Sequence, residues 1–268
     1  MKIAAFGSTY AGAYVFPTYK AADDLTTERP SSLQRVGSTS GAFDFLGSTA
    51  NPIMPLTVRK SFEIVASTYA GVETALNTAR ASLLAADESK LWALMRDGSK
   101  RWTYAKVTAF SAPESVGTRQ TIPVSVEFAC REGLWYGETA NTQAIVGTTV
   151  YTVTNAGNAT APLKITAAIS SVNMTSVRFD VDYGSIAPLY RVTYGGTVVP
   201  GTSLVIDSGA YSVTNNGAAD YANLTVASTA GDYWLALKPG SSDLHISAIT
   251  HPAGTRTVTA EWYDTWVM

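Results

Sequence analysis

Histidine, cysteine and charged residues are scarce in this sequence. Their scarcity argues against metal sites, disulfides and electrostatic binding of nucleic acids or membranes. Two histidines and one cysteine among 268 residues leave little basis for a histidine/cysteine metal site and none for an intramolecular disulfide. Charged residues make up 15% of the chain and the formal net charge is −2, too weak to hold nucleic acid or an anionic membrane. No apolar run approaches the roughly 20 residues of a membrane span, and no export signal begins the chain. We expect neither membrane insertion nor sequence-specific nucleic-acid binding.

The side chains with catalytic potential are isolated from one another. His245 and His251 both lie near the carboxyl end; strand alternation predicts that His245 faces solvent, and His251 precedes a proline in a turn. Cys130 ends an apolar alternation, which predicts a buried, inert thiol. We therefore assign no catalytic, cofactor-binding or metal-binding residue.

One acidic segment imitates a calcium-binding loop. Asp180, Asp182 and Gly184 have the spacing that begins such a loop. The twelfth position, which needs a bidentate carboxylate, is Arg191. The sequence therefore predicts an ordinary acidic turn.

Two further patterns resemble catalytic motifs only superficially. The segment Gly37–Gly41 has the glycine spacing of a nucleophile elbow, but Thr39 stands at its centre in a polar loop. Glu73, Asp87 and Glu88 resemble the paired carboxylates of a glycosidase, but they lie on and just beyond a solvated helix face. We interpret them as solubilising charge.

What the sequence does contain is typical of a mainly β protein with a single helix. It has 14 tyrosines, 6 tryptophans and 21 glycines, suited to half-buried strands joined by tight turns. The one helical period covers about 71–86, with Glu73, Asn77 and Arg80 on its polar side. Its apolar stripe consists of Val72, Ala75, Leu76, Ala79 and Leu83.

The first half of the chain is predicted to pack strands against this helix. Met1–Pro17 suits an opening strand or bent hairpin, and residues 21–55 a long arm with one short strand. Thr57–Val65 alternates as a half-buried strand in which Lys60 is the exception. Asp97-Gly98 predicts a tight hairpin, and Thr121–Cys130 a strand in which Pro123 marks the start or an edge. We expect a first domain over 1–138, a β-sandwich with this helix packed on it.

The second half predicts a separate antiparallel sandwich. The polar segment 139–148 is the best linker, and many short strands follow over 149–268 with turn residues between them. The aromatic residues of both halves can fill cores, stack on sugars or form subunit interfaces, and we expect more than half to be core. The residues concerned are Trp92, Trp102, Tyr104, Trp135, Tyr136, Tyr233, Trp234, Trp262, Tyr263 and Trp266.

Two stretches together resemble the distal tail proteins of long-tailed bacteriophages. The first, similar to the family's amino-terminal tail-hub domain, comprises the helix, Leu91–Gly98, Arg101–Val107, Ile122–Phe128 and Leu134–Gly137. The second, similar to its carboxyl-terminal galectin-like sandwich, comprises Thr154–Gly157, Ala161–Ile165, Leu204–Asp207, Tyr233–Gly240 and Thr257–Trp262. The galectin sugar site is not implied, because Trp135–Glu138 lacks the accompanying histidine and arginine cluster.

The resemblance implies a structural role and no enzyme activity. It implies a hexameric ring at the tip of the virion tail that joins the tail tube to the adhesion apparatus and continues the DNA channel. Its partners would be other copies of the chain, the tail tube protein and hub or fibre proteins, with the tape measure protein as a further candidate. Synthesis would take place in the host cytoplasm. A carbohydrate-binding module or adhesin subunit is the alternative; a hydrolase with an unrecognised site has less support.

Overall fold

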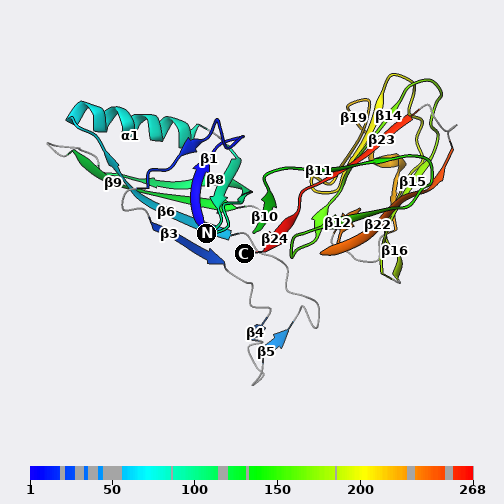
Figure 1. Cartoon of the computed structure of the whole chain (residues 1–268), viewed down its shortest axis with the longest axis horizontal. Coiled ribbons are helices and arrows are strands. Elements are labelled where there is room, and N and C mark those ends of the chain that lie inside the picture. Colours follow the sequence, from blue (N-terminus) through cyan, green and yellow to red (C-terminus); the bar gives the residue numbers. More distant parts are fainter. Residues whose placement is uncertain are drawn as a thin grey trace. The chain divides into compact units, whose positions relative to one another are not determined.

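The computed structural model is mainly β, with several antiparallel sheets and, in the part described, one α-helix (Figure 1). It describes residues 1–18, 22–27, 33–35, 42–44, 56–85, 87–113, 120–130, 133–184, 186–227, 233–250 and 256–267. The predicted mainly β class with one helix is confirmed. Met1–Trp135 and Tyr136–Val267 form two compact units, called here unit 1 and unit 2. No helix in the described ranges is long and apolar enough to cross a membrane.

Unit 1 is built on one antiparallel sheet with the strand order β2-β1-β7-β8-β9-β6-β3. The predicted opening hairpin is formed by β1 and β2, and the predicted Asp97-Gly98 turn joins β7 to β8, with Gly98 at φ +84°. The strands are β1 (Lys2–Phe6), β2 (Tyr14–Val15), β3 (Ala22–Thr27), β6 (Leu56–Val65), β7 (Ser89–Leu94), β8 (Lys100–Ser111) and β9 (Thr121–Cys130). β10 (Leu134–Gly137) contains the division between the units.

Helix α1 (Tyr69–Leu84) covers one face of this sheet (Figure 1). It begins two residues before the predicted start, because the Thr68 hydroxyl accepts a hydrogen bond from the Gly71 amide at 3.1 Å and so caps the first turn. Its buried residues are Val72, Leu76, Ala79 and Leu83, four of the five in the predicted stripe. The apolar period therefore identified the packed face correctly.

Lys60 can stand at a buried position in the alternation of β6 because its ammonium group has a carboxylate partner. Its side chain is 1% exposed and its Nζ lies 2.6 Å from Asp23 Oδ1 on β3. The other carboxylate oxygen of Asp23 accepts the Ile3 amide of β1 at 2.8 Å. One carboxylate therefore compensates a buried ammonium group and joins β3, β6 and β1.

The segment 21–55 contains more regular structure than the single short strand predicted. β3 belongs to the main sheet, where Thr27 pairs with Leu56, and β4 (Leu33–Arg35) pairs with β5 (Ala42–Asp44). The polar composition of β3 does not indicate a strand. Only its pairing with β6, which is distant in the sequence, reveals one. The rest of this segment lies outside the described residues.

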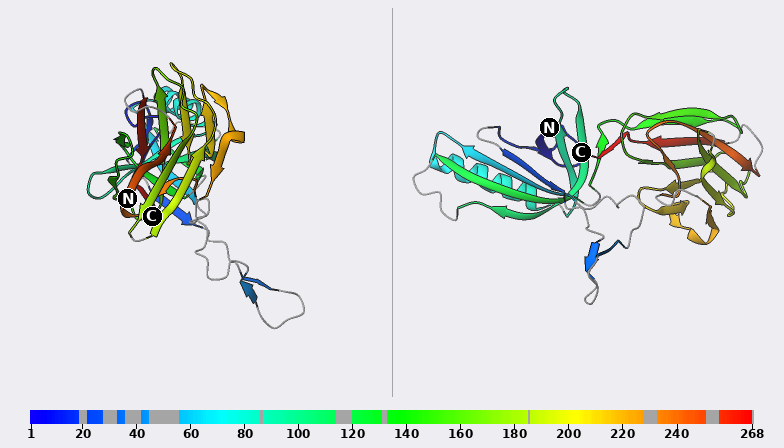
Figure 2. Two further views of the ribbon diagram at one scale, coloured as in Figure 1. Left: turned by 90° about the vertical axis from the view of Figure 1, so that its right-hand side faces the viewer. Right: turned by 90° about the horizontal axis from the view of Figure 1, so that it is seen from below.

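Unit 2 is a sandwich of two antiparallel sheets (Figure 2). One has the order β11-β23-β14-β17-β18-β19 and the other β12-β22-β15-β16-β20, and their inner side chains form one apolar core. The first sheet consists of β11 (Asn141–Ile145), β14 (Lys164–Ile169), β17 (Ser203–Asp207), β18 (Ser212–Asn215), β19 (Ala218–Ala219) and β23 (Arg256–Trp262). The second consists of β12 (Tyr151–Asn155), β15 (Val177–Tyr183), β16 (Ile186–Tyr194), β20 (Leu224–Val226) and β22 (Gly240–Ile249).

Short elements complete unit 2, and one of its strands corrects the predicted linker. β13 (Ala161–Pro162) pairs with β21 (Ala236–Leu237), while the 3-10 helix η1 (Tyr221–Asn223) and β24 (Thr265–Val267) lie near the strand ends. The proposed linker 139–148 contains β11, which pairs along its whole length with β23 and buries Ile145. Its polar residues belong to a strand with one exposed face, so composition alone misidentified it.

Candidate functional site

The residues considered for catalysis remain dispersed in the structure. Cys130 is fully buried, as predicted, and burial raises the pKa of its thiol to about 12, which disfavours the reactive thiolate. Among the described residues no group of histidine, cysteine and carboxylate side chains is arranged to hold a metal ion. His251 and Gly37–Gly41 lie outside the described residues.

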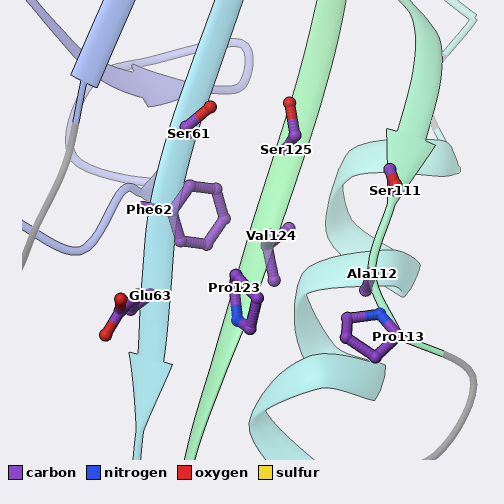
Figure 3. Close-up of a pocket in the computed structure, with 9 residues that line it drawn as sticks. All are labelled: Ser61, Phe62, Glu63, Ser111, Ala112, Pro113, Pro123, Val124 and Ser125. Carbon is purple, nitrogen blue, oxygen red and sulfur yellow. The ribbon is translucent and has the colours of Figure 1, made fainter.

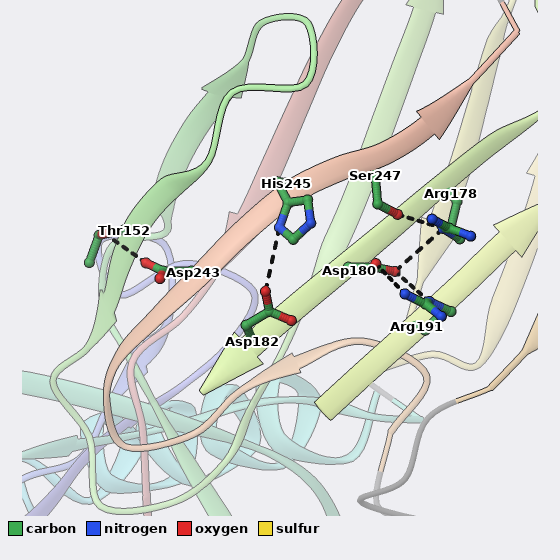
Figure 4. A network of polar contacts seen from close by, with 8 residues as sticks. All are labelled: Thr152, Arg178, Asp180, Asp182, Arg191, Asp243, His245 and Ser247. Atoms are coloured by element: carbon green, nitrogen blue, oxygen red, sulfur yellow. Dashed lines mark hydrogen bonds and ion pairs between the residues drawn. The ribbon is translucent and has the colours of Figure 1, made fainter. Parts of the chain in front are cut away.

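The densest group of charged side chains lies on the face of β15, β16 and β22 that points away from the core of unit 2 (Figure 4). Asp180 is 2% exposed and receives two hydrogen bonds from Arg191, at 2.9 Å from Nε and 2.7 Å from Nη2. Arg178 lies on the other side of Asp180 and donates from Nε to Ser247 at 2.6 Å. This group corrects the predicted acidic turn, because Asp180 and Asp182 belong to β15.

The arginines determine the ionisation of Asp180. Burial by itself raises the pKa of this carboxyl group, but hydrogen bonds from Arg191 and Ser247 and the charges of both arginines lower it below its ordinary value. A carboxylate held ionised by a bidentate arginine is a poor proton donor or acceptor at neutral pH. The arrangement fits cross-strand stabilisation better than acid–base chemistry.

His245 continues this row of side chains toward the edge of the sheet (Figure 4). It lies on the face opposite Leu244 and Ile246, as strand alternation predicted, but it is half-buried there, and its Nδ1 lies 3.9 Å from Asp182 Oδ2. The neighbouring Asp243 pairs in register with Asp182 and accepts a 2.7 Å hydrogen bond from Thr152. No nucleophile contacts the imidazole among these partners, so the face lacks the paired arrangement that nucleophilic catalysis requires.

An open hollow of about 510 Å³ is present on unit 1 (Figure 3). Ser61, Ser125 and Ser111 form one cross-strand row on β6, β9 and β8, and Glu63 pairs in register with Pro123. The last residue of β8 pairs with Ser125, so β9 has no β8 residue beside it at Pro123. Pro123 therefore lies at a local edge of the sheet, where a residue without a backbone N–H is tolerated. β6, β8 and β9 contain no histidine that could activate these serines.

The aromatic residues singled out from the sequence are divided evenly between buried and half-buried positions. Five of the ten are buried, namely Trp92, Trp102, Trp135, Tyr136 and Trp262, so the expected majority in the core is not reached. In unit 1, Lys90 Nζ lies 3.9 Å from the centre of the Trp102 ring, and burial lowers the pKa of that lysine. Trp92 and Trp102 are therefore packed inside unit 1, and the ammonium group of Lys90 lies over their rings.

The surfaces best suited to contacts between proteins are the sheet edges and the outer side of α1. β2 and β3 end the sheet of unit 1, and Val15 on β2 is 59% exposed. Glu73, Asn77 and Thr78 lie exposed on α1, where Thr78 bonds back to the Thr74 carbonyl. An open strand edge and a nearly uncharged helix face both favour association over binding of a small ligand.

Comparison with known proteins gives a clear result for the fold. No protein-family model and no curated protein sequence matches the chain. The crystal structure of the Dit (gp 19.1) protein of phage SPP1, described as a paradigm of hub adsorption apparatus, matches with a TM-score of 0.59 and 14% identity over 92% of this chain and 90% of that one. A chain of the phage p2 baseplate in its activated conformation with Sr matches with a TM-score of 0.50 and 8% identity over 97% and 98%. The resemblance inferred from the sequence is confirmed as a shared fold with a phage tail hub protein.

Proposed function

We propose that this chain is a structural component of a phage tail tip, where it acts as the distal tail protein. The observation that carries the proposal is the match to the SPP1 Dit fold over 92% of the chain, including both units. Sequence order supports it independently, because motifs resembling the tail-hub and galectin-like domains follow one another in the family's order. The protein would be located in the virion after synthesis in the host cytoplasm.

In this proposal, Met1–Trp135 forms the tail-hub domain and Tyr136–Val267, which includes β11, a galectin-like sandwich. Six copies of the first domain form a ring that continues the DNA channel, and the partners are the tail tube protein, hub or fibre proteins and the tape measure protein. A channel that passes DNA without gripping it needs no basic stripe, which agrees with the net charge of −2. The exposed side of α1 and the edges of the unit 1 sheet are the proposed subunit contacts.

Light scattering combined with negative-stain electron microscopy tests the assembly. The expected result is a concentration-dependent ring of six copies, weakened when Asn77→Arg places a bulky charge on the outer side of α1. Thr225→Arg, at an exposed position on β20 of unit 2, is the matched control and should leave the ring intact. A chain that stays monomeric at every concentration, also with tail tube protein added, contradicts the proposal.

A further inference from the structure

Four aromatic rings from three separate segments meet on the surface of unit 2. We call them the tyrosine platform: Tyr211, Tyr221, Tyr233 and Trp234. Tyr211 stacks on Tyr233 with ring centres 5.9 Å apart and planes 18° apart. Trp234 stands nearly perpendicular to Tyr211 and Tyr221, at 5.7 and 6.4 Å. Tyr211 is 47% exposed and Tyr221 53% exposed, so the group is open to solvent.

The backbone beneath the platform is built to hold these rings in place. Buried Ser208, in the turn before Tyr211, accepts the Leu235 amide at 3.0 Å and so fixes that turn to the segment carrying Tyr233 and Trp234. The Tyr221 hydroxyl donates to the Tyr211 carbonyl at 3.3 Å, which connects η1 to the same turn. The rings are therefore preorganised, which reduces the entropy lost on binding.

Tyr211 occupies a backbone conformation that disfavours a side chain. Its φ is +49°, in the left-handed region where a non-glycine residue costs about 1–2 kcal/mol. Glycine would relieve that strain, and a purely structural aromatic residue would be expected to bury its ring. A strained tyrosine that remains half exposed indicates a ring presented to a partner.

The polar groups beside the rings indicate what kind of partner. Asp220 accepts hydrogen bonds from Tyr194 at 2.6 Å and from Asn223 at 2.8 Å, so a fixed carboxylate and amide lie next to Tyr221 in the chain. A pyranose ring has an apolar C–H face that stacks on an aromatic ring and hydroxyl groups that bond to carboxylates and amides. A carboxylate offers about four acceptor positions, so Asp220 can accept a sugar hydroxyl in addition to these two bonds, and its negative charge favours a neutral ligand over an anionic one. A large protein interface would instead require an extended apolar patch.

From this combination of stacked, half-exposed rings and adjacent fixed acceptors, we propose that the tyrosine platform binds a neutral saccharide. This goes beyond the proposed structural function, because it adds a ligand to unit 2. It also differs from the galectin-type site considered in the sequence, which involved Trp135–Glu138. The site resides in the loops beside β18 and β21 and needs no histidine.

Titration of the full chain with neutral linear tetrasaccharides of glucose, galactose and N-acetylglucosamine, followed by calorimetry and tryptophan fluorescence, tests the site. At least one should bind, and Tyr221→Ala should weaken binding roughly tenfold or more by removing one stacking ring. Tyr211→Gly should weaken it similarly while its unfolding midpoint stays near that of the parent, because strain relief offsets the lost stacking. Tyr221→Phe, which keeps the ring, should retain most of the affinity.

Tyr69→Ala supplies the matched control, since Tyr69 is 44% exposed on α1 of unit 1 and should not affect saccharide binding. If no tetrasaccharide binds at millimolar concentration, or if binding survives Tyr221→Ala, the proposal is overturned. Loss of association with another tail protein in the tyrosine variants, without saccharide binding by the parent, would also overturn it in favour of a protein contact. Ring assembly is measured separately by light scattering, so failure of one proposal does not conceal the other.

Discussion

The two units close their apolar cores in different ways. Unit 1 covers one face of its sheet with α1, whose buried stripe includes Val72, Leu76 and Leu83, whereas unit 2 places one sheet against another. In unit 1 a single amphipathic helix covers the apolar face of the sheet. In unit 2 many short strands each contribute a small part of the covering layer. Unit 1 should therefore be more sensitive to one substitution in its covering layer.

The units also differ in how they hold a buried charge. Lys60 in unit 1 points to the core side of the sheet and depends on Asp23, whose side chain is 14% exposed. Asp180 in unit 2 lies on the outer face and is shared by Arg191 and Arg178. Removing one partner should therefore do more damage in unit 1 than in unit 2.

The largest expected effect comes from Leu76→Asp, which places a carboxylate under α1. Burial of an unpaired charge should destabilise unit 1 by about 4 kcal/mol or more and unfold it, while unit 2 stays folded. Hydrogen exchange followed by mass spectrometry should show lost protection in Met1–Trp135 only. Asn77→Asp, one residue along on the exposed side, should change stability by less than about 0.5 kcal/mol. Unchanged protection in the Leu76→Asp protein would show that the buried side of the helix is wrongly assigned.

An intermediate effect is expected from Lys60→Met, which keeps an unbranched side chain, one atom shorter, and removes the charge. Asp23 is then left without its cation, and unit 1 should lose about 3 kcal/mol in urea unfolding. Adding Asp23→Asn should recover most of that loss, because the amide oxygen can still accept the Ile3 amide. Equal destabilisation in the single and double variants would show that the pair contributes by packing alone.

The smallest expected effect is in unit 2, from Asp180→Asn, at about 2 kcal/mol near pH 7. Because its folded-state pKa is lowered, Asp180 stabilises the fold above the ordinary aspartate pKa of about 3.9, and this contribution is lost as pH falls below it. Stability measured against pH should therefore fall less steeply in acid for the variant than for the parent. Asp243→Asn, which removes a like charge opposite Asp182, should be neutral or slightly stabilising. A parallel acid dependence in parent and Asp180→Asn would refute the assignment.

Local patterns predicted much of the fold correctly. The period of α1, the Asp97-Gly98 turn and the alternation of Thr121–Cys130 each depend on neighbouring residues, and the structure confirms all three. The polar strands β3 and β11 were missed because only pairing with β6 and β23 reveals them. A polar strand that forms by pairing with a distant segment has no clear pattern in its own sequence.

The candidate surfaces were harder to anticipate than the fold. Arg191 was noted in the sequence only as the residue that breaks a calcium loop, whereas the structure shows it as the partner of Asp180. Tyr211 and Tyr221 carry no sequence signal of a shared site, because each stands in a turn-rich segment without a motif. A signal was available in Ser208-Gly209, a turn dipeptide separated from Tyr211 by one alanine, but it does not identify which rings Tyr211 meets.

The sequence by itself determined a mainly β chain with one amphipathic helix, an unreactive cysteine and a resemblance to phage distal tail proteins. These properties depend on composition, short periods and motif order, all of which are encoded locally. Only the tertiary structure decided that Asp23 compensates Lys60 and that Tyr211, Tyr221, Tyr233 and Trp234 form one platform. The reason is that strand register and loop packing bring together residues far apart in the chain, and a register shift of one residue would reverse which side chains meet.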